Sequence, residues 1–221
     1  MVMLVRLYCD FRRIILNNPK KRNALSFAML TSLQENILTG IDDKDLRVII
    51  ISAQGPVFSS GHDLKELTSE QGRDYHSRVF RTCSEVMTLI QDLPVPVIAM
   101  EWPLEEAVPR KVAMEMLFTG RPITAQEALL HGLVSKVVRE ECLEEETLAI
   151  ARRICESSRP VVALGKAAFQ RQMAQSRDAA YATATAVMVD NLALYDGQEG
   201  IQAFLEKRRP LWTNSTERAH D

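Results

Sequence analysis

The 221-residue sequence has few cysteines, little net charge and no long apolar run. Its four cysteines form no C-x-x-C pair and its four histidines lack metal-ligand spacing, so neither a disulfide framework nor a metal site is supported. The cysteines are typical of reduced thiols in an intracellular compartment. The formal charge of −2 gives no reason to expect nucleic acid as a partner. No apolar run approaches the ~20 residues of a membrane span.

Glycine-rich nucleotide motifs are also absent. Neither G-x-G-x-x-G nor a phosphate-binding P-loop occurs, so a dinucleotide or ATP function has no support. The first half instead alternates strand and helix patterns: strands at residues 13–16, 47–53 and 97–100, and helices at residues 26–38 and 74–91. This alternation predicts an α/β fold with a mainly parallel sheet.

The second half is mostly helical. Thr124 with Glu127, and Asp196 with Glu199, have the spacing of a capping box at a helix start. Pro160 suits the first turn of a helix, and an alanine-rich helix follows at residues 178–195. A plain helical subdomain would explain this half without any function.

The most informative motif is the loop at residues 57–67, Val-Phe-Ser-Ser-Gly-His-Asp-Leu-Lys-Glu-Leu, which follows a strand and opens a predicted helix. Gly61 allows the backbone to turn sharply and approach a ligand. Amides at a helix start point outward, and the helix dipole favours negative charge there. The His62 N–H is therefore placed to hold a developing oxyanion. On local features alone, an ordinary strand-to-helix turn with Asp63 as N-cap is favoured.

Flanking motifs change that balance. They lie in order at residues 14–25, 47–58, 94–99, 113–120, 125–128 and 132–138. The ordered set resembles the enoyl-CoA hydratase/isomerase (crotonase) family over most of the chain. The resemblance implies a crotonase-like α/β fold, a ββα spiral with mainly parallel strands. It also implies a role in fatty-acid metabolism, an acyl-CoA as substrate with no separate cofactor, and a homo-trimer or hexamer.

The resemblance also implies a location in the mitochondrial matrix. The first eight residues do not have the character of a transit peptide, so a cytoplasmic location stays open.

The resemblance assigns roles to individual positions. His62 would supply, through its backbone N–H, the first of two donors in an oxyanion hole. Basic residues would bind the phosphates of CoA, although a solvated surface charge is the simpler interpretation of any single lysine. The positions carried over for substrate and CoA binding are Arg22, Ala24, Ser60, Gly61, Asp63, Lys65 and Lys207.

The sequence departs from the family after Met100. There the family continues into a glycine-rich helix start, which supplies the second oxyanion donor, and then into the acid/base carboxylates. Here only residues 101–106 precede the next family-like helix. Their glutamates are best interpreted as a solvated linker. Losing one oxyanion donor costs ~10²–10³ in turnover, and each acid/base contribution is worth ~10²–10⁴.

We therefore predict an incomplete crotonase α/β core at residues 1–106 and a helical C-terminal region at residues 107–221, to which the resemblance assigns trimer packing and covering of the CoA site. Whether this chain is an enzyme stays open: the family is hydratase-like, and hydration is expected to be weak or absent. One alternative is a non-catalytic acyl-CoA-binding or regulatory subunit. Another is an unstable splice or gene-model variant, because a missing core segment exposes apolar faces and folded proteins have a stability margin of only ~5–15 kcal/mol.

Overall fold

The computed structural model describes residues 2–8, 10–100 and 109–219. Four strands form one sheet in the order β1-β2-β3-β4. They are β1 (Met3–Leu7), β2 (Phe11–Leu16), β3 (Val48–Ala53) and β4 (Val97–Ala99). The pairs β2–β3 and β3–β4 are parallel, whereas β1 pairs with β2 in antiparallel fashion. The mainly parallel α/β sheet is confirmed, and β1 is a strand that the sequence analysis missed.

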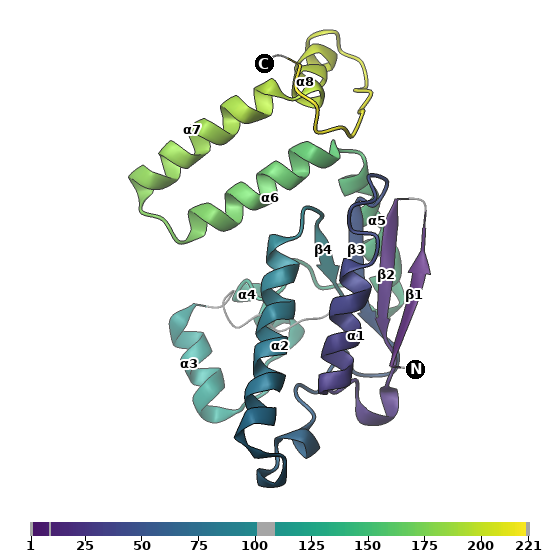
Figure 1. Ribbon diagram of the computed structural model, residues 1–221, viewed down its shortest axis with the longest axis vertical. Helices are drawn as coiled ribbons and strands as arrows, with labels where there is room; N and C mark the ends of the chain where they lie inside the picture. Colours follow the sequence, from purple (N-terminus) through teal and green to yellow (C-terminus); the bar gives the residue numbers. More distant parts are fainter. Residues whose placement is uncertain (1, 9, 101–108, 220–221) are drawn as a thin grey trace.

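Helices cover both faces of this sheet (Figure 1). On one face lie α1 (Phe27–Leu38) and α2 (Gly72–Asp92), and on the other lies α5 (Leu143–Cys155). Side chains alternate along a strand, so Ile49 and Ile51 of β3 join the α1–α2 core while Val48 and Ile50 face Ala151 of α5. The central strand is thus buried on both faces, as its continuous apolar run predicts.

The predicted helix signals are confirmed at two starts. The Ser26 side chain accepts a hydrogen bond from the Met29 N–H and caps α1. Thr124 and Glu127 form a complete capping box at the start of α4 (Ala125–Leu130). Each cap satisfies backbone donors that would otherwise lack a partner.

The remaining helices build the C-terminal half. They are α3 (Arg110–Thr119), α6 (Arg159–Met173), α7 (Arg177–Ala193) and α8 (Tyr195–Leu205). Short 3₁₀ helices lie at Pro19–Lys21 (η1), Leu64–Leu67 (η2), Ser69–Gln71 (η3) and Glu140–Cys142 (η5). Figure 1 shows α6 and α7 as an antiparallel pair beyond the ends of α1 and α2. The helix α8 packs against this pair where α7 ends. The predicted domain boundary, between residues 106 and 107, lies outside the described residues.

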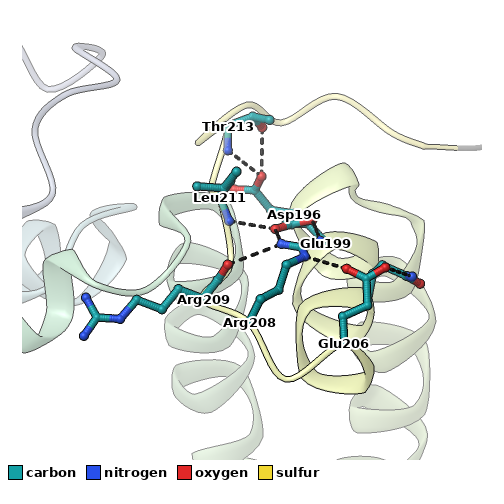
Figure 2. Close-up of polar contacts among 8 residues, drawn as sticks. Asp196, Glu199, Glu206, Arg208, Arg209, Leu211 and Thr213 are labelled. Carbon is teal, nitrogen blue, oxygen red and sulfur yellow. Dashed lines mark hydrogen bonds and ion pairs between the residues drawn. The ribbon is translucent and has the colours of Figure 1, made fainter.

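The predicted capping box at Asp196 and Glu199 is wrong. Neither side chain caps α8. Asp196 is buried and accepts hydrogen bonds from Ser158, Thr213 and Asn214. Glu199 pairs with Arg208 instead (Figure 2). Both carboxylates are occupied by partners outside the first turn of α8, so neither is left to cap it.

Large apolar side chains lie exposed on the C-terminal helices. Phe118 of α3, Leu130 of α4 and Phe204 of α8 are 78%, 80% and 81% exposed. The strand β4 is one edge of the described sheet. Isolated exposed apolar residues are ordinary on a protein surface, and these three lie on separate helices of the C-terminal half. Within the described ranges, none of the helices combines the length and the apolar character needed to cross a membrane.

Candidate functional site

The loop after β3 has the sharp turn expected of it. Gly61 adopts a φ of +81°, which L-residues rarely adopt, and no atom lies within 4 Å of where a side chain would begin. Glycine is thus required by the backbone conformation and not by lack of space. The Asp63 carboxylate accepts a hydrogen bond from the Lys65 N–H at 3.1 Å, so it is the predicted N-cap.

The predicted helix after this loop is only the four-residue 3₁₀ helix η2, and α2 begins later, at Gly72. So short an element has a small dipole, because the macrodipole is a sum over aligned peptide units. The helix dipole therefore contributes little to anion binding at this loop.

Hydrogen bonds orient the donor instead. The Leu25 N–H donates to the Gly61 carbonyl at 2.8 Å. In a planar trans peptide the C=O and the following N–H point in opposite directions, so the His62 N–H points away from Leu25. Among the described residues, the His62 N–H has no hydrogen-bond acceptor. It is available to a ligand oxygen, which is the role predicted for it.

The His62 imidazole has a different environment from its N–H. Its ring packs edge-on against Phe80, with 4.9 Å between the ring centroids. Its Nδ1 is buried, and no partner for it lies in the part of the chain that the structure describes. The ring therefore fixes the residue by packing against Phe80.

The facing turn, at residues 18–25, depends on a residue that the sequence analysis did not single out. Asn23 is completely buried and has a φ of +51°. Its Nδ2 donates to the carbonyls of Gln54 (3.0 Å) and Val57 (2.8 Å), and its Oδ1 accepts from the Asn18 N–H (2.8 Å). Asparagine tolerates the left-handed conformation better than most residues. An asparagine directly after Lys-Lys-Arg is therefore the sequence signal that could have indicated the structural role of Asn23.

A charged pair links the turn to the loop. Lys21 Nζ donates to Asp63 Oδ2 at 3.1 Å. The hydrogen bond from Lys21 lowers the pKa of Asp63, because it stabilises the ionised carboxylate, and the Lys65 N–H adds to this effect. The carboxylate is therefore ionised and occupied near neutral pH.

The structure brings most of the predicted positions together. Ala24 is buried beside Leu25 in the turn, and Arg22 is exposed and accepts a backbone hydrogen bond from Ser60 at 3.0 Å. Lys65 is exposed on η2. The turn and the loop thus lie side by side, with Ala24 and Asp63 buried and Arg22, Ser60, Gly61 and Lys65 exposed.

Lys207 is the one predicted binding residue that does not lie near the other predicted positions in the same chain. It follows α8, which lies at the opposite end of the molecule from the start of α2 (Figure 1). Its neighbour Arg208 is held by Glu199, with Nη–Oε distances of 2.5 and 2.9 Å, and by Glu206 at 2.6 Å (Figure 2). The hydrogen bond from Arg208, and then that from the Leu211 N–H, lower the pKa of Glu199 to about 2. Arg208 thus fixes the C-terminal segment.

The second donor predicted for the family site has no described counterpart. The sheet ends at β4, where the Met100 N–H donates to the Ile51 carbonyl at 2.9 Å. The next described residue is Pro109, so Glu101, Glu105 and Glu106 lie outside the described residues. Within the described part of the chain, no group of histidine, cysteine, aspartate and glutamate has the geometry of a metal site.

The mainly parallel sheet covered on both faces is of the crotonase type, as its match to solved enoyl-CoA hydratase structures shows. The chain belongs to the enoyl-CoA hydratase/isomerase family, whose model matches residues 11–101 and residues 100–215. The predicted family is therefore confirmed.

Three relatives place the chain more closely. It is 58% identical to enoyl-CoA hydratase domain-containing protein 3, mitochondrial, of Danio rerio, over 95% of this chain and 86% of that protein. The crystal structure of the human protein of the same name matches with a TM-score of 0.93 and 55% identity, over 96% of this chain and 100% of that one. An enoyl-CoA hydratase structure from Mycobacterium smegmatis matches with a TM-score of 0.90 and 35% identity, over 96% and 99%.

The comparisons also bear on the gap after Met100. The two segments matched to the family model meet at residues 100–101. The alignment with the Danio rerio protein runs over 250 positions, whereas 95% of this 221-residue chain is about 210 residues. About 40 positions of the relative therefore have no counterpart here. The predicted absence of an internal segment is consistent with both observations.

Proposed function

We propose that this chain is an enoyl-CoA hydratase/isomerase-like protein of fatty-acid metabolism that binds acyl-CoA and has weak or no hydratase activity. The observation that carries the proposal is the His62 N–H, which the Leu25–Gly61 hydrogen bond turns outward and leaves without an acceptor among the described residues. A thioester carbonyl is a suitable acceptor for it.

The charge around this donor supports an anionic ligand. Lys20, Lys21 and Arg22 are exposed on the turn, and Lys65 is exposed on the loop. CoA carries several phosphate charges, which basic groups at the entrance of a site attract. Lys207 would reach such a ligand only from a second copy of the chain, because it lies at the far end of its own protomer.

Weak catalysis follows from the state of the nearby carboxylates. A hydratase needs one carboxylate to activate water and another to deliver a proton. Asp63 is occupied by Lys21 and by the Lys65 N–H. Glu66 accepts a hydrogen bond from the Phe27 N–H at 2.7 Å, at the start of α1. Both carboxylates are engaged in hydrogen bonds that hold the loop and the start of α1, which supports weak catalysis, and one oxyanion donor alone stabilises an enolate poorly.

Calorimetric titration with butyryl-CoA tests the binding. We expect wild-type chain and His62→Ala to bind with similar affinity, because alanine keeps the backbone N–H. His62→Pro deletes that N–H, so it should bind roughly tenfold more weakly. Equal affinity of the proline and alanine variants, or no binding by the wild type, would contradict the proposal.

A second candidate is a non-catalytic acyl-CoA-binding or regulatory subunit that packs into a trimer or hexamer. The exposed apolar side chains of α3, α4 and α8 favour it, because contact with another subunit would cover them. Acyl-CoA binding by an oligomer that has no turnover, measured by light scattering together with calorimetry, would support this candidate.

The third candidate is an unstable variant. The edge strand β4 and the exposed helices motivate it. A cooperative, high-temperature thermal melt of the purified chain would count against it. For location we propose the mitochondrial matrix. The names of the relatives support a mitochondrial location, and targeting of a tagged chain in cells is the test.

A further inference from the structure

Two side chains link the donor loop to the facing turn. Ser59 Oγ donates to the Asn23 carbonyl at 3.0 Å and accepts from the Gly61 N–H at 3.2 Å. The other end of Gly61 is also held, because its carbonyl accepts from the Leu25 N–H at 2.8 Å. The residue that precedes His62 is therefore fixed on both of its peptide groups.

The anchor of this link is the buried amide of Asn23. Its Nδ2 supplies two donors to two carbonyls of the segment that leaves β3, and its Oδ1 accepts from the turn. Among side chains of this size, only an amide offers two donors and an acceptor together. An aspartate would place an oxygen against the carbonyls of Gln54 and Val57, and a leucine would leave all three backbone groups without a partner.

This connection sets the direction of the His62 N–H. The Gly61 N–H belongs to the Ser60–Gly61 peptide group, and the Gly61 C=O belongs to the Gly61–His62 group that carries the His62 N–H. If either group rotated, its protein partner would be replaced by water, and the His62 N–H would sample directions away from the ligand. A donor fixed before the ligand arrives costs no reorganisation when it binds. The two bonds of Ser59 and the three of Asn23 together restrict that rotation.

We propose that Asn23 and Ser59 are positioning residues that hold the Gly61–His62 peptide in the orientation that binds an acyl thioester oxygen. The proposal deepens the proposed function and rests on it. Neither side chain touches the ligand in this account. Both act through the backbone N–H of His62.

Ser59→Ala is the principal test, since it removes one hydroxyl and keeps the backbone. The probe is butyryl-CoA labelled with ¹³C at the thioester carbonyl, bound to the full chain. In the wild type we expect the carbonyl resonance to shift on binding, because a hydrogen bond polarises the carbonyl. In Ser59→Ala most of that shift should be lost, and affinity should fall by about 3- to 10-fold.

Two control variants separate positioning from general stability. Ser59→Thr keeps the hydroxyl and should restore the carbonyl shift. Ser84→Ala changes an exposed serine of α2 and should leave shift and affinity unchanged. A serine whose role is only structural would lower the melting temperature of Ser59→Ala without changing the carbonyl shift of the folded, ligand-bound fraction, and that result would overturn the proposal.

Amide hydrogen exchange without ligand provides the second measurement. Losing its acceptor should make the Gly61 N–H exchange about 3- to 10-fold faster in Ser59→Ala than in the wild type. Asn23→Asp should accelerate it further. If wild-type chain does not bind butyryl-CoA, the proposed function fails, yet faster Gly61 exchange would still support the link. Unchanged Gly61 exchange would overturn the link whatever the ligand result.

Discussion

Asp196→Asn should release the C-terminal segment from the helical half. The Asp196 carboxylate is 1% exposed and accepts from Ser158 Oγ (2.7 Å), the Thr213 N–H and hydroxyl (both 2.8 Å) and the Asn214 N–H (3.0 Å). An asparagine can still accept from Thr213, but its NH₂ then faces Ser158 and the Asn214 N–H. The serine hydroxyl can rotate to accept, whereas the backbone N–H cannot.

The magnitude follows from this count of bonds. One hydrogen bond is lost, one buried donor is left unpaired and the others lose their charge assistance. At about 1 kcal/mol for each lost bond and about 1–3 kcal/mol for the unpaired donor, the free energy of unfolding should fall by about 2–4 kcal/mol. With a urea dependence of about 1–3 kcal/mol per M, the unfolding midpoint should fall by roughly 1–3 M.

Trp212 provides the assay, because its Nε1 donates to the Glu156 carbonyl at 2.6 Å within the segment that should detach. A Trp102→Phe background leaves it as the single tryptophan, and its emission is followed against urea. Asp190→Asn is the control: among the described residues this exposed carboxylate pairs with Arg218 alone, at 3.5 Å, and the substitution should cost at most about 1 kcal/mol. Equal midpoints for the two variants would refute the reasoning.

Two further predictions concern pH. Burial first of all lowers the pKa of Lys166 from 10.5 to about 8, although its Nζ donates to the Ile90 and Val95 carbonyls. Between these values the unfolded chain binds more protons, so the stability of the wild type relative to Lys166→Met should rise from pH 8 to pH 10.5, as measured by urea midpoints. A flat difference would contradict this. The pKa of about 2 for Glu199 predicts that its bonds to Arg208 persist well below pH 4.5 and are lost as the pH falls through about 2. In pepsin digestion at pH 3, Glu199→Gln should therefore lose its C-terminal segment faster than the wild type, and equal rates would count against the assignment.

Much of the fold could be predicted because its signals are local. The cap at Ser26, the box at Thr124 and the apolar run of β3 each depend on neighbouring residues. The strand β1 could not be predicted in this way, because it becomes a strand only through its pairing with β2. The Tyr8 N–H donates to the Phe11 carbonyl at 2.9 Å where the two strands meet. A short apolar segment near a chain end gives no such signal by itself.

The candidate site was predicted in part for the same reason. Gly61 and Asp63 act within their own loop, so their types at that spacing were informative. Asn23 acts on carbonyls 31 and 34 residues away, which no local pattern indicates. The misassigned Asp196 likewise has its buried partner Ser158 38 residues away. Local sequence patterns therefore do not predict the roles of side chains whose partners are distant in the sequence.

The central claim is that this chain retains one half of an oxyanion site, binding acyl-CoA while hydrating it weakly or not at all. Steady-state hydration of crotonyl-CoA tests it most directly, with wild-type chain compared with His62→Pro and with an intact family hydratase at equal concentration. The account predicts a wild-type rate at least about 10²-fold below that of the intact enzyme. Hydration by the wild type at a rate comparable to the intact enzyme, abolished in His62→Pro, would contradict it.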